Sequence, residues 1–345
     1  MKKKVGIIGA TGYAGAELVR IILSHPLVEL AALSSVSFDG KQLSEVYPSF
    51  KNICDMVCES ADEAVRKSDI IFACLPHGLS QPLAKQCCEL NKIFIDLGAD
   101  FRLHSEEDYA EWYSGKFDDK ALHEGAVYSL PELFRDEIKK AKVIANPGCY
   151  PTSIALGLAP ALKNRIVSAD GIIIDSKSGV TGAGRSLTEN THYPVCNEAF
   201  SPYKIGSHRH TPEIEQTLSC LCGKRVKVTF VPHLLPVNRG IVSTIYAKLS
   251  CDYSLGDIHK IYEDFYKNEQ FVRVLSLGKT ANLRDVKYSN YCDISIHIDT
   301  RTGTLIIVST IDNMVKGAAG QAVQNMNIAL GIDENTGLLF VPPAF

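Results

Sequence analysis

The sequence predicts an α/β fold in two domains, the first built on a parallel sheet and the second on a mixed, largely antiparallel sheet. The chain has 345 residues, which is more than one hydrophobic core usually covers. Up to about residue 148, short β-rich runs alternate with longer amphipathic runs, a pattern typical of a parallel sheet with crossover helices. Later β-rich runs lack a helix after every strand, so we expect an α+β arrangement there.

The first domain is predicted to contain five strands and three of the helices between them. Apolar residues at helical spacing mark the first helix, and Pro26 ends it because proline disfavours helix in the residue before it. The strands are expected at residues 5–8, 28–33, 69–74, 92–95 and 143–145, and the helices at residues 16–23, 61–67 and 80–90.

The second domain is predicted to begin with a helix from about residue 152 to residue 162, with Pro151 at its first position. Strands are expected at residues 226–231 and 241–249, and a β-hairpin joins residues 291–299 to residues 305–308. The first hairpin strand alternates strictly, which predicts one buried face and one wet face. The buried face would carry Cys292, Ile294, Ile296 and Ile298, and the wet face Asp293, Ser295, His297 and Asp299. Residues 313–330 predict one long helix.

Composition and charge favour a soluble protein that acts on a small molecule. The net charge of -3 argues against a surface for nucleic acid or anionic lipid. No run reaches the roughly 18 apolar residues of a membrane span, and glycines interrupt the apolar segment that follows the basic N-terminus. The eleven cysteines are odd in number and irregularly spaced, which indicates free thiols in a reducing compartment and no structural metal site. We therefore expect a cytoplasmic protein.

The turn after the first strand carries a glycine at every third position, from Gly6 to Gly15. A backbone without side chains can approach a pyrophosphate closely, and the helix that follows offers N–H groups and a positive dipole end. Tight turns also require glycine for other reasons, and a flavin would fit a similar loop. The position after the first strand favours a Rossmann-type dinucleotide site, whose contacts we expect from Gly9, Ala10, Thr11, Gly12, Tyr13, Ala14 and Gly15.

The end of the second strand favours NADPH over NADH. NAD-specific sites of this fold usually place a carboxylate there for the ribose 2'-hydroxyl. Here the strand ends in Ser34 and Ser35, whose hydroxyls can donate to a 2'-phosphate and do not repel it. No nearby arginine reinforces the prediction.

Cys149 is the candidate nucleophile. It follows the strand at residues 143–145 and precedes an apolar helix, and a helix N-terminus stabilises a thiolate. The alternative is a buried structural cysteine, the commonest fate of a cysteine. The Pro147-Gly148-Cys149 turn at a helix start favours the nucleophile.

A second candidate cluster, His208-Arg209-His210, opens another helix. The histidines offer a base for a thiol, and Arg209 offers a cation for a carboxylate or phosphate. Zinc binding and a solvated helix cap are the alternatives, but no third ligand stands at a helpful spacing. We expect His210 to be the acid/base, because the turn before Pro212 fixes its position, and His208 to support it or to contact substrate.

Two further segments point to substrate. Residues 178–185 form a glycine-rich loop that either closes over substrate, with Ser178 and Gly179 at its start, or is an ordinary surface turn. Arg102 follows a strand at the sheet edge where ligands bind in such folds. Taken alone, a single arginine there is a weak signal.

Five motifs together resemble the N-acetyl-γ-glutamyl-phosphate reductase family of arginine biosynthesis, which is related to aspartate-semialdehyde dehydrogenase. The motifs are residues 9–15, 100–103, 146–152 (Asn-Pro-Gly-Cys-Tyr-Pro-Thr), 178–185 and 208–214 (His-Arg-His-Thr-Pro-Glu-Ile). Residues 236–240 depart from the broader dehydrogenase relatives, because Ile241 follows where those proteins place a histidine. The base is therefore expected from His208 or His210.

The resemblance implies an NADPH-dependent reduction of an acyl phosphate to an aldehyde through a thioester on Cys149. It also implies Arg102 as a phosphate contact, Asn313 near the nicotinamide amide, and a homo-oligomer, either a dimer or a tetramer. The last helix would complete the cofactor domain, giving residues 1–148 with 314–345 for NADP and residues 149–313 for catalysis and oligomerisation. The alternatives are the carrier-linked aminoadipyl-phosphate reductase of lysine biosynthesis, aspartate-semialdehyde dehydrogenase, and a nucleotide-sensing regulator that has lost turnover.

Overall fold

The computed structural model describes residues 2–344, which divide into two compact units. Unit 1 contains residues up to 147 together with residues 318–339, and unit 2 contains residues 148–317 with the last few residues. Each unit is built around its own sheet, as predicted.

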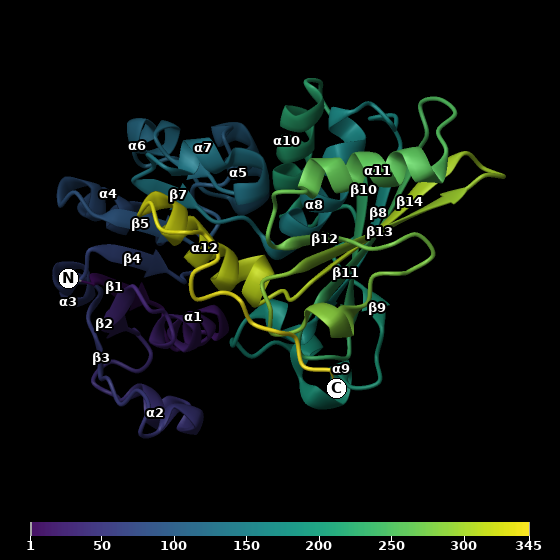
Figure 1. Cartoon of the computed structure of the whole chain (residues 1–345). Coiled ribbons are helices and arrows are strands. Elements are labelled where there is room, and N and C mark those ends of the chain that lie inside the picture. Colours follow the sequence, from purple (N-terminus) through teal and green to yellow (C-terminus); the bar gives the residue numbers. More distant parts are fainter. Residues whose placement is uncertain (1, 345) are drawn as a thin grey trace. The chain divides into compact units, whose positions relative to one another are not determined.

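The sheet of unit 1 has seven strands, all parallel, in the order β3-β2-β1-β4-β5-β7-β6 (Figure 1). The five predicted strands are confirmed as β1 (Lys3–Ile8), β2 (Val28–Ser34), β4 (Ile70–Ala73), β5 (Ile93–Asp96) and β7 (Val143–Ala145). Two-residue strands β3 (Cys58–Glu59) and β6 (Val127–Tyr128) extend the edges, and are too short for a periodic signal. The chain runs outward from β1 through β2 and then returns to β4 beside β1. This strand order places a topological switch point at the carboxyl ends of β1 and β4, where ligands bind in open α/β sheets.

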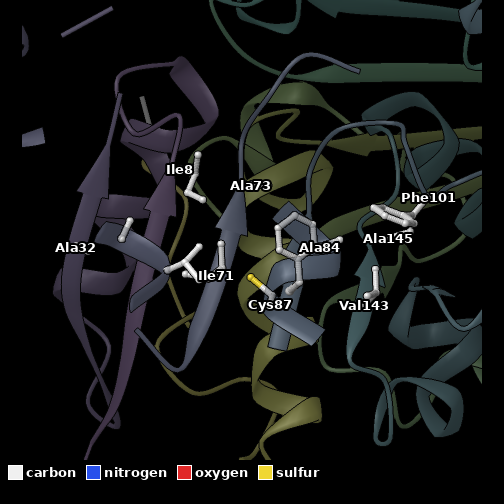
Figure 2. Packing of buried hydrophobic residues seen from close by; sticks show 12 residues of the cluster. Ile8, Ala32, Ile71, Ala73, Ala84, Cys87, Phe101, Val143 and Ala145 are labelled. Atoms are coloured by element: carbon white, nitrogen blue, oxygen red, sulfur yellow. The ribbon is translucent and has the colours of Figure 1, made fainter. Parts of the chain in front are cut away.

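The three predicted helices of unit 1 are confirmed as α1 (Tyr13–Leu23), α3 (Ala61–Lys67) and α4 (Gln81–Glu89). The helices without a predicted counterpart are α2 (Leu43–Val46), α5 (Glu106–Tyr113), α6 (Lys120–Glu124) and α7 (Pro131–Ile138). Figure 2 shows small and bulky side chains interleaved in one core cluster, including Ala84 and Cys87 of α4 against Ile71 of β4. Burial raises the pKa of Cys87 to about 12, so this thiol is unreactive.

Residues 313–330 do not form one regular helix, in contrast to the prediction. A π-helical turn, η5 (Val315–Ala319), precedes α12 (Gly320–Ala329). Helix α12 packs on α7 and α1 and is buried on all sides rather than along one stripe. Its polar side chains have specific partners: Asn325 Nδ2 donates to the carbonyl oxygen of Ser129 and to Asn146 Oδ1, at 3.0 Å in both cases. These bonds explain how an amide-rich helix can be buried.

The sheet of unit 2 also has seven strands, in the order β12-β13-β14-β11-β8-β10-β9. Four of its six strand pairs are antiparallel, which confirms the mixed, largely antiparallel prediction. The strands are β8 (Ile172–Gly179), β9 (Ser201–Pro202), β10 (Val228–Leu235), β11 (Ile241–Lys248), β12 (Val272–Val274), β13 (Cys292–Asp299) and β14 (Thr304–Ile311). Helix α8 (Cys149–Lys163) packs on β11 and β14 and contacts α10 (Thr211–Cys222) and α11 (Leu255–Tyr266). The short α9 (Tyr193–Cys196) lies in the connection between β8 and β9.

Two local predictions in unit 2 are wrong. Helix α8 begins at Cys149 and not near residue 152, so Pro151 occupies its third position. The polar face of β13 is not wet over its first half, because Asp293 and Ser295 are buried. Asp293 accepts two hydrogen bonds from Arg273 of β12, at 2.6 and 3.0 Å, and Ser295 Oγ accepts one from the backbone of Ala281. Other segments of the same chain cover this face. Alternation along one strand cannot show that such segments are present.

Candidate active site

The glycine loop of unit 1 joins β1 to α1 through close backbone contacts. Gly9 has φ of +82°, and a Cβ there would lie 2.4 Å from the carbonyl oxygen of Cys74. A Cβ at Gly15 would lie 2.3 Å from the carbonyl oxygen of Gly9. These two glycines are therefore required by the turn itself. Gly12 is the N-cap of α1 and has no side chain to cap it, so the helix presents its N–H end to this loop.

The hydroxyl groups at the end of β2 lie against the glycine loop. The backbone N–H groups of Gly9 and Ala10 donate to the carbonyl oxygen of Ser34, at 2.9 and 3.0 Å. Thr11 Oγ1 and Ser35 Oγ are 2.6 Å apart. Tyr47 donates to the carbonyl oxygen of Thr11 and completes a small polar cluster. The loop and the strand end thus form one unit with hydroxyls where an NAD-specific site would carry a carboxylate.

Cys149 is the first residue of α8, and Gly148 is the N-cap. Its side chain is partly exposed. The backbone N–H of Gly148 donates to Oε1 of the fully buried Glu213, at 2.7 Å, which joins the start of α8 to the first turn of α10. A Cβ at Gly317 would lie 2.8 Å from the Cβ of Cys149, so only glycine allows η5 to approach the thiol this closely. The first turn of α8 therefore holds the cysteine in a constrained place with an N–H end toward it.

His208 and His210 lie at the start of α10, where His210 occupies the N-cap position. The backbone N–H of His210 donates to Nδ1 of His208 at 3.1 Å. Because Nδ1 accepts this bond, the neutral ring of His208 carries its proton on Nε2. Burial, with the positive charges of Lys204 and Arg209, lowers the pKa of His208 to about 4. His208 is therefore neutral near pH 7, with one defined tautomer.

Two tyrosines connect the histidines to the nucleophile helix. Tyr150, next to Cys149, packs edge-on against the rings of His208 and His210, with centroids 5.5 and 5.9 Å apart. Its hydroxyl lies 3.1 Å from that of Tyr203, which in turn lies 3.5 Å from Nε2 of His208. Burial raises the pKa of both phenols, that of Tyr203 to about 12. The structure thus brings the cysteine helix and both histidines together within unit 2.

Ser178 and Gly179 end β8, and the loop after them forms a 3₁₀ turn at Val180–Ala183 (η2). A Cβ at Gly179 would lie 2.7 Å from the carbonyl oxygen of Asn238, so the loop is packed against the turn at residues 236–240. Asn313 is buried and bonds both segments: Nδ2 donates to Thr181 Oγ1 at 3.0 Å, and Oδ1 accepts from the backbone of Gly240 at 2.6 Å. Asn313 therefore belongs to this loop cluster of unit 2.

The two candidate arginines differ in their surroundings. Arg102 is buried in unit 1 at the carboxyl ends of β5 and β7, and its Nε and Nη2 donate to the carbonyl oxygens of Asn146 and Leu97, both at 2.8 Å. Arg209 of unit 2 is exposed. A guanidinium bound to two carbonyls is held in one orientation.

Several residues of the candidate site carry no role in the sequence analysis, namely Tyr150, Tyr203, Glu213 and Gly317. Glu213 stands inside a motif, but only the structure shows its bond to Gly148. Tyr203 lies far from Cys149 in sequence and has no periodic or motif signal. Contacts between segments distant in sequence are the information that was missing.

Comparisons with known proteins agree with this arrangement. Residues 4–141 match the family model described as the semialdehyde dehydrogenase NAD binding domain, and residues 149–313 match the semialdehyde dehydrogenase dimerisation domain. Aspartate semialdehyde dehydrogenase with NADP from Candida albicans has the same fold, with a TM-score of 0.71 over 97% of this chain and 100% of that one, at 16% identity. Among residues 2–344, no helix has the length and apolar character to cross a membrane, and no group of three His, Cys, Asp or Glu side chains could hold a metal ion.

Curated relatives are far more similar. An N-acetyl-gamma-glutamyl-phosphate reductase of Brachyspira hyodysenteriae is 62% identical and one of Clostridium beijerinckii is 58% identical, each over 99% of both chains. One of Pelotomaculum thermopropionicum is 52% identical over 98% of both chains. The resemblance seen in the five motifs is therefore confirmed, and the chain belongs to the N-acetyl-gamma-glutamyl-phosphate reductase family of NAD(P)-dependent oxidoreductases.

Proposed function

We propose that this protein reduces N-acetyl-γ-glutamyl phosphate with NADPH to N-acetylglutamate 5-semialdehyde and phosphate, in arginine biosynthesis. The observation that carries the proposal is Cys149 at the first position of α8, with two imidazoles packed on the adjacent Tyr150. A position at a helix start and a nearby base are the two features that activate a thiol for attack on an acyl group.

In the proposed reaction, His210 takes the proton of the Cys149 thiol, and the thiolate attacks the γ-carbonyl carbon. The carbon–oxygen bond to phosphate breaks, and the phosphate leaves with the proton that His210 took up, so that a thioester forms on Cys149. NADPH, when bound, supplies a hydride to the thioester carbon. The resulting alkoxide collapses, which breaks the carbon–sulfur bond and returns Cys149 as a thiolate, and a proton from water restores the thiol. Covalent catalysis separates phosphate release from reduction.

The glycine loop fits the proposed cofactor. Substitution with any larger residue at Gly9 or Gly15 would clash with backbone, and the bare N-terminal end of α1 suits a pyrophosphate. We propose Ser34 and Ser35 as contacts for the 2'-phosphate and Asn313 as a contact for the nicotinamide amide. The remaining proposed cofactor contacts are Gly9, Ala10, Thr11, Gly12, Tyr13, Ala14 and Gly15. The proposed cofactor domain is residues 1–148 with 314–345.

For the substrate, we propose Arg102 and Arg209 as partners of its anionic groups, with Ser178 and Gly179 at the edge of its site. The proposed role of His208 is to support His210, because its Nδ1 already accepts the backbone N–H of His210. We also propose that the enzyme is a cytoplasmic homo-oligomer, a dimer or a tetramer. The dimerisation-domain description of residues 149–313 supports this, and light scattering after gel filtration measures it.

The reverse reaction tests the function directly. We expect phosphate-dependent reduction of NADP⁺ with N-acetylglutamate semialdehyde, and at least about 100-fold lower kcat/KM with aspartate semialdehyde, whose shorter chain and free amino group alter its binding. Equal or better turnover of aspartate semialdehyde would contradict the proposed substrate. NADP⁺ reduction that does not depend on phosphate would contradict the thioester route.

A further inference from the structure

A row of three serines crosses the sheet of unit 2 beneath helix α8. Ser176 of β8 is opposite Ser243 of β11 in the sheet register, and Ser243 is opposite Ser309 of β14. All three side chains are fully buried. Their neighbours on the same face of these strands are Ile174, Ile241, Ile245, Ile307 and Ile311, together with the buried Ser178 at the end of β8. The serine row thus crosses a face that is aliphatic on either side of it except at Ser178.

The hydroxyls of this serine row form a chain that reaches the helix. Ser176 Oγ and Ser243 Oγ are 2.8 Å apart. Ser153 of α8, also fully buried, has its Oγ 3.1 Å from Ser243 Oγ and 3.2 Å from Ser309 Oγ. One helical side chain is therefore joined to two adjacent strands.

Ser153 lies on the same face of α8 as the candidate nucleophile. It follows Cys149 by four residues, so the two side chains are one turn apart on one stripe. Gly157 continues this stripe, and a Cβ there would lie 3.1 Å from Ile245 Cδ1 and 3.3 Å from Ser309 Cβ. The helix therefore lies close against the sheet at this turn, and its contact with the serines is direct.

Helix α11 provides a second hydroxyl contact to the same part of α8. Pro160 has no N–H, so the carbonyl oxygen of Leu156 lacks its usual helical donor. The hydroxyl of Tyr266 donates to that oxygen, and the hydroxyl of Tyr262 donates to the carbonyl oxygen of Gly157 at 2.8 Å. Apolar packing tolerates small sliding of a helix, whereas hydrogen bonds are directional. Hydroxyls on both sides therefore define where α8 sits along its axis.

We propose that Ser153 and the serine row are positioning residues that fix the axial position of α8, and with it Cys149 relative to the histidines of α10. The inference rests on the proposed role of Cys149 as nucleophile. Aliphatic residues of suitable volume would meet the need for burial at these positions, and a buried hydroxyl must find partners to be tolerated. Only the hydroxyls, through their directional hydrogen bonds, fix the position of α8 along its axis. Displacement of a reacting group by about 1 Å can lower a rate on the order of 100-fold.

Ser153→Ala tests the proposal most directly, because it cuts the link to the helix and leaves the bond between Ser176 and Ser243 in place. We expect kcat of the phosphate-dependent reaction to fall at least about tenfold, with KM for the semialdehyde within about twofold. Tm should fall by no more than a few degrees, because Ser309 Oγ keeps Cys292 Sγ at 3.4 Å as a partner. Alkylation of Cys149 by iodoacetamide, followed on its own peptide by mass spectrometry, should slow severalfold. The control is Thr229→Ala on the exposed side of β10, which should change none of these quantities.

A second variant replaces Ser153, Ser176, Ser243 and Ser309 together by alanine. Removing all partners at once leaves no unpaired hydroxyl, so we expect Tm to stay close to that of the wild type while kcat falls as in the single variant. If either variant folds and keeps both kcat and the alkylation rate within about twofold of wild type, the proposal is wrong. The alkylation assay needs no substrate, so it tests positioning even if the proposed substrate is incorrect.

Discussion

Replacing the two histidines separately should give different kinetic effects. In His210→Asn the proposed base is lost, and a positioned base typically contributes roughly 10²- to 10⁴-fold, so we expect kcat to fall at least about 100-fold. In His208→Asn the amide oxygen can still accept the N–H of His210 that Nδ1 accepts at 3.1 Å, so kcat should change less and KM more. Because the pKa of His208 is lowered to about 4, only about one ring in a thousand is protonated at pH 7. Its loss should leave the pH profile of kcat/KM unchanged above about pH 5.

The assay is kcat and KM from pH 5 to 9, together with the rate at which iodoacetamide alkylates Cys149. His210→Asn should slow alkylation near pH 7, and His208→Asn should not. If the two variants exchange these effects, His208 is the base and its assigned tautomer is wrong. If neither slows alkylation, the thiolate is stabilised by the start of α8 alone.

Four other changes test separate parts of the proposed site. Cys149→Ser should lower kcat more than tenfold and leave NADPH affinity, measured by fluorescence titration, within a few fold; a serine enzyme with over a tenth of the wild-type kcat would contradict covalent catalysis. Ser34→Asp should shift the ratio of kcat/KM toward NADH by repelling the 2'-phosphate, and an unchanged ratio would place that phosphate elsewhere. Arg102→Lys should raise KM for phosphate in the reverse reaction; a fall in kcat at unchanged KM would instead assign Arg102 to holding the carbonyl of Asn146. Burial and the nearby Asp100 raise the pKa of Asp96 to about 6, so this group's stabilising contribution is complete below about pH 4 and is lost as pH rises through 6. Asp96→Asn should therefore stabilise the protein by about 2 kcal/mol more at pH 7 than at pH 4 in urea unfolding, and an equal effect at both pH values would show that Asp96 does not titrate in this range.

The sequence predicts the elements that have a strong local signal. Strands such as β7 and helices such as α3 have the predicted bounds, because a short apolar run defines the first and an amphipathic run with Ser60 as its N-cap defines the second. The glycine loop is also recognisable from the sequence, since the backbone contacts at Gly9 and Gly15 leave no room for a side chain and so require glycine. Short edge strands and the helices between residues 105 and 139 escape prediction, because their stability comes from packing and not from periodicity.

The candidate site shows the same division between local and distant information. Cys149 and His210 are recognisable because each stands at a helix start that the sequence marks with proline and glycine. The residues packed around them cannot be recognised in this way, since Glu213, Gly317 and Tyr203 reach the site only through the fold.

Buried polar residues are the clearest case of this limit. Asp293 reads as a solvent-facing residue because its strand alternates, yet Arg273 on the neighbouring strand pairs with it inside unit 2. The partners of Ser243 cannot be found from its own strand either, because only the sheet register places Ser176 and Ser309 on either side of it. Burying a polar residue alone costs free energy, whereas burying it with its hydrogen-bond partners is tolerated. Whether it stabilises or destabilises the fold therefore depends on residues that are distant in sequence. Burial of several such groups around one helix is therefore an observation that calls for a functional explanation, and the placement of Cys149 provides one that can be measured.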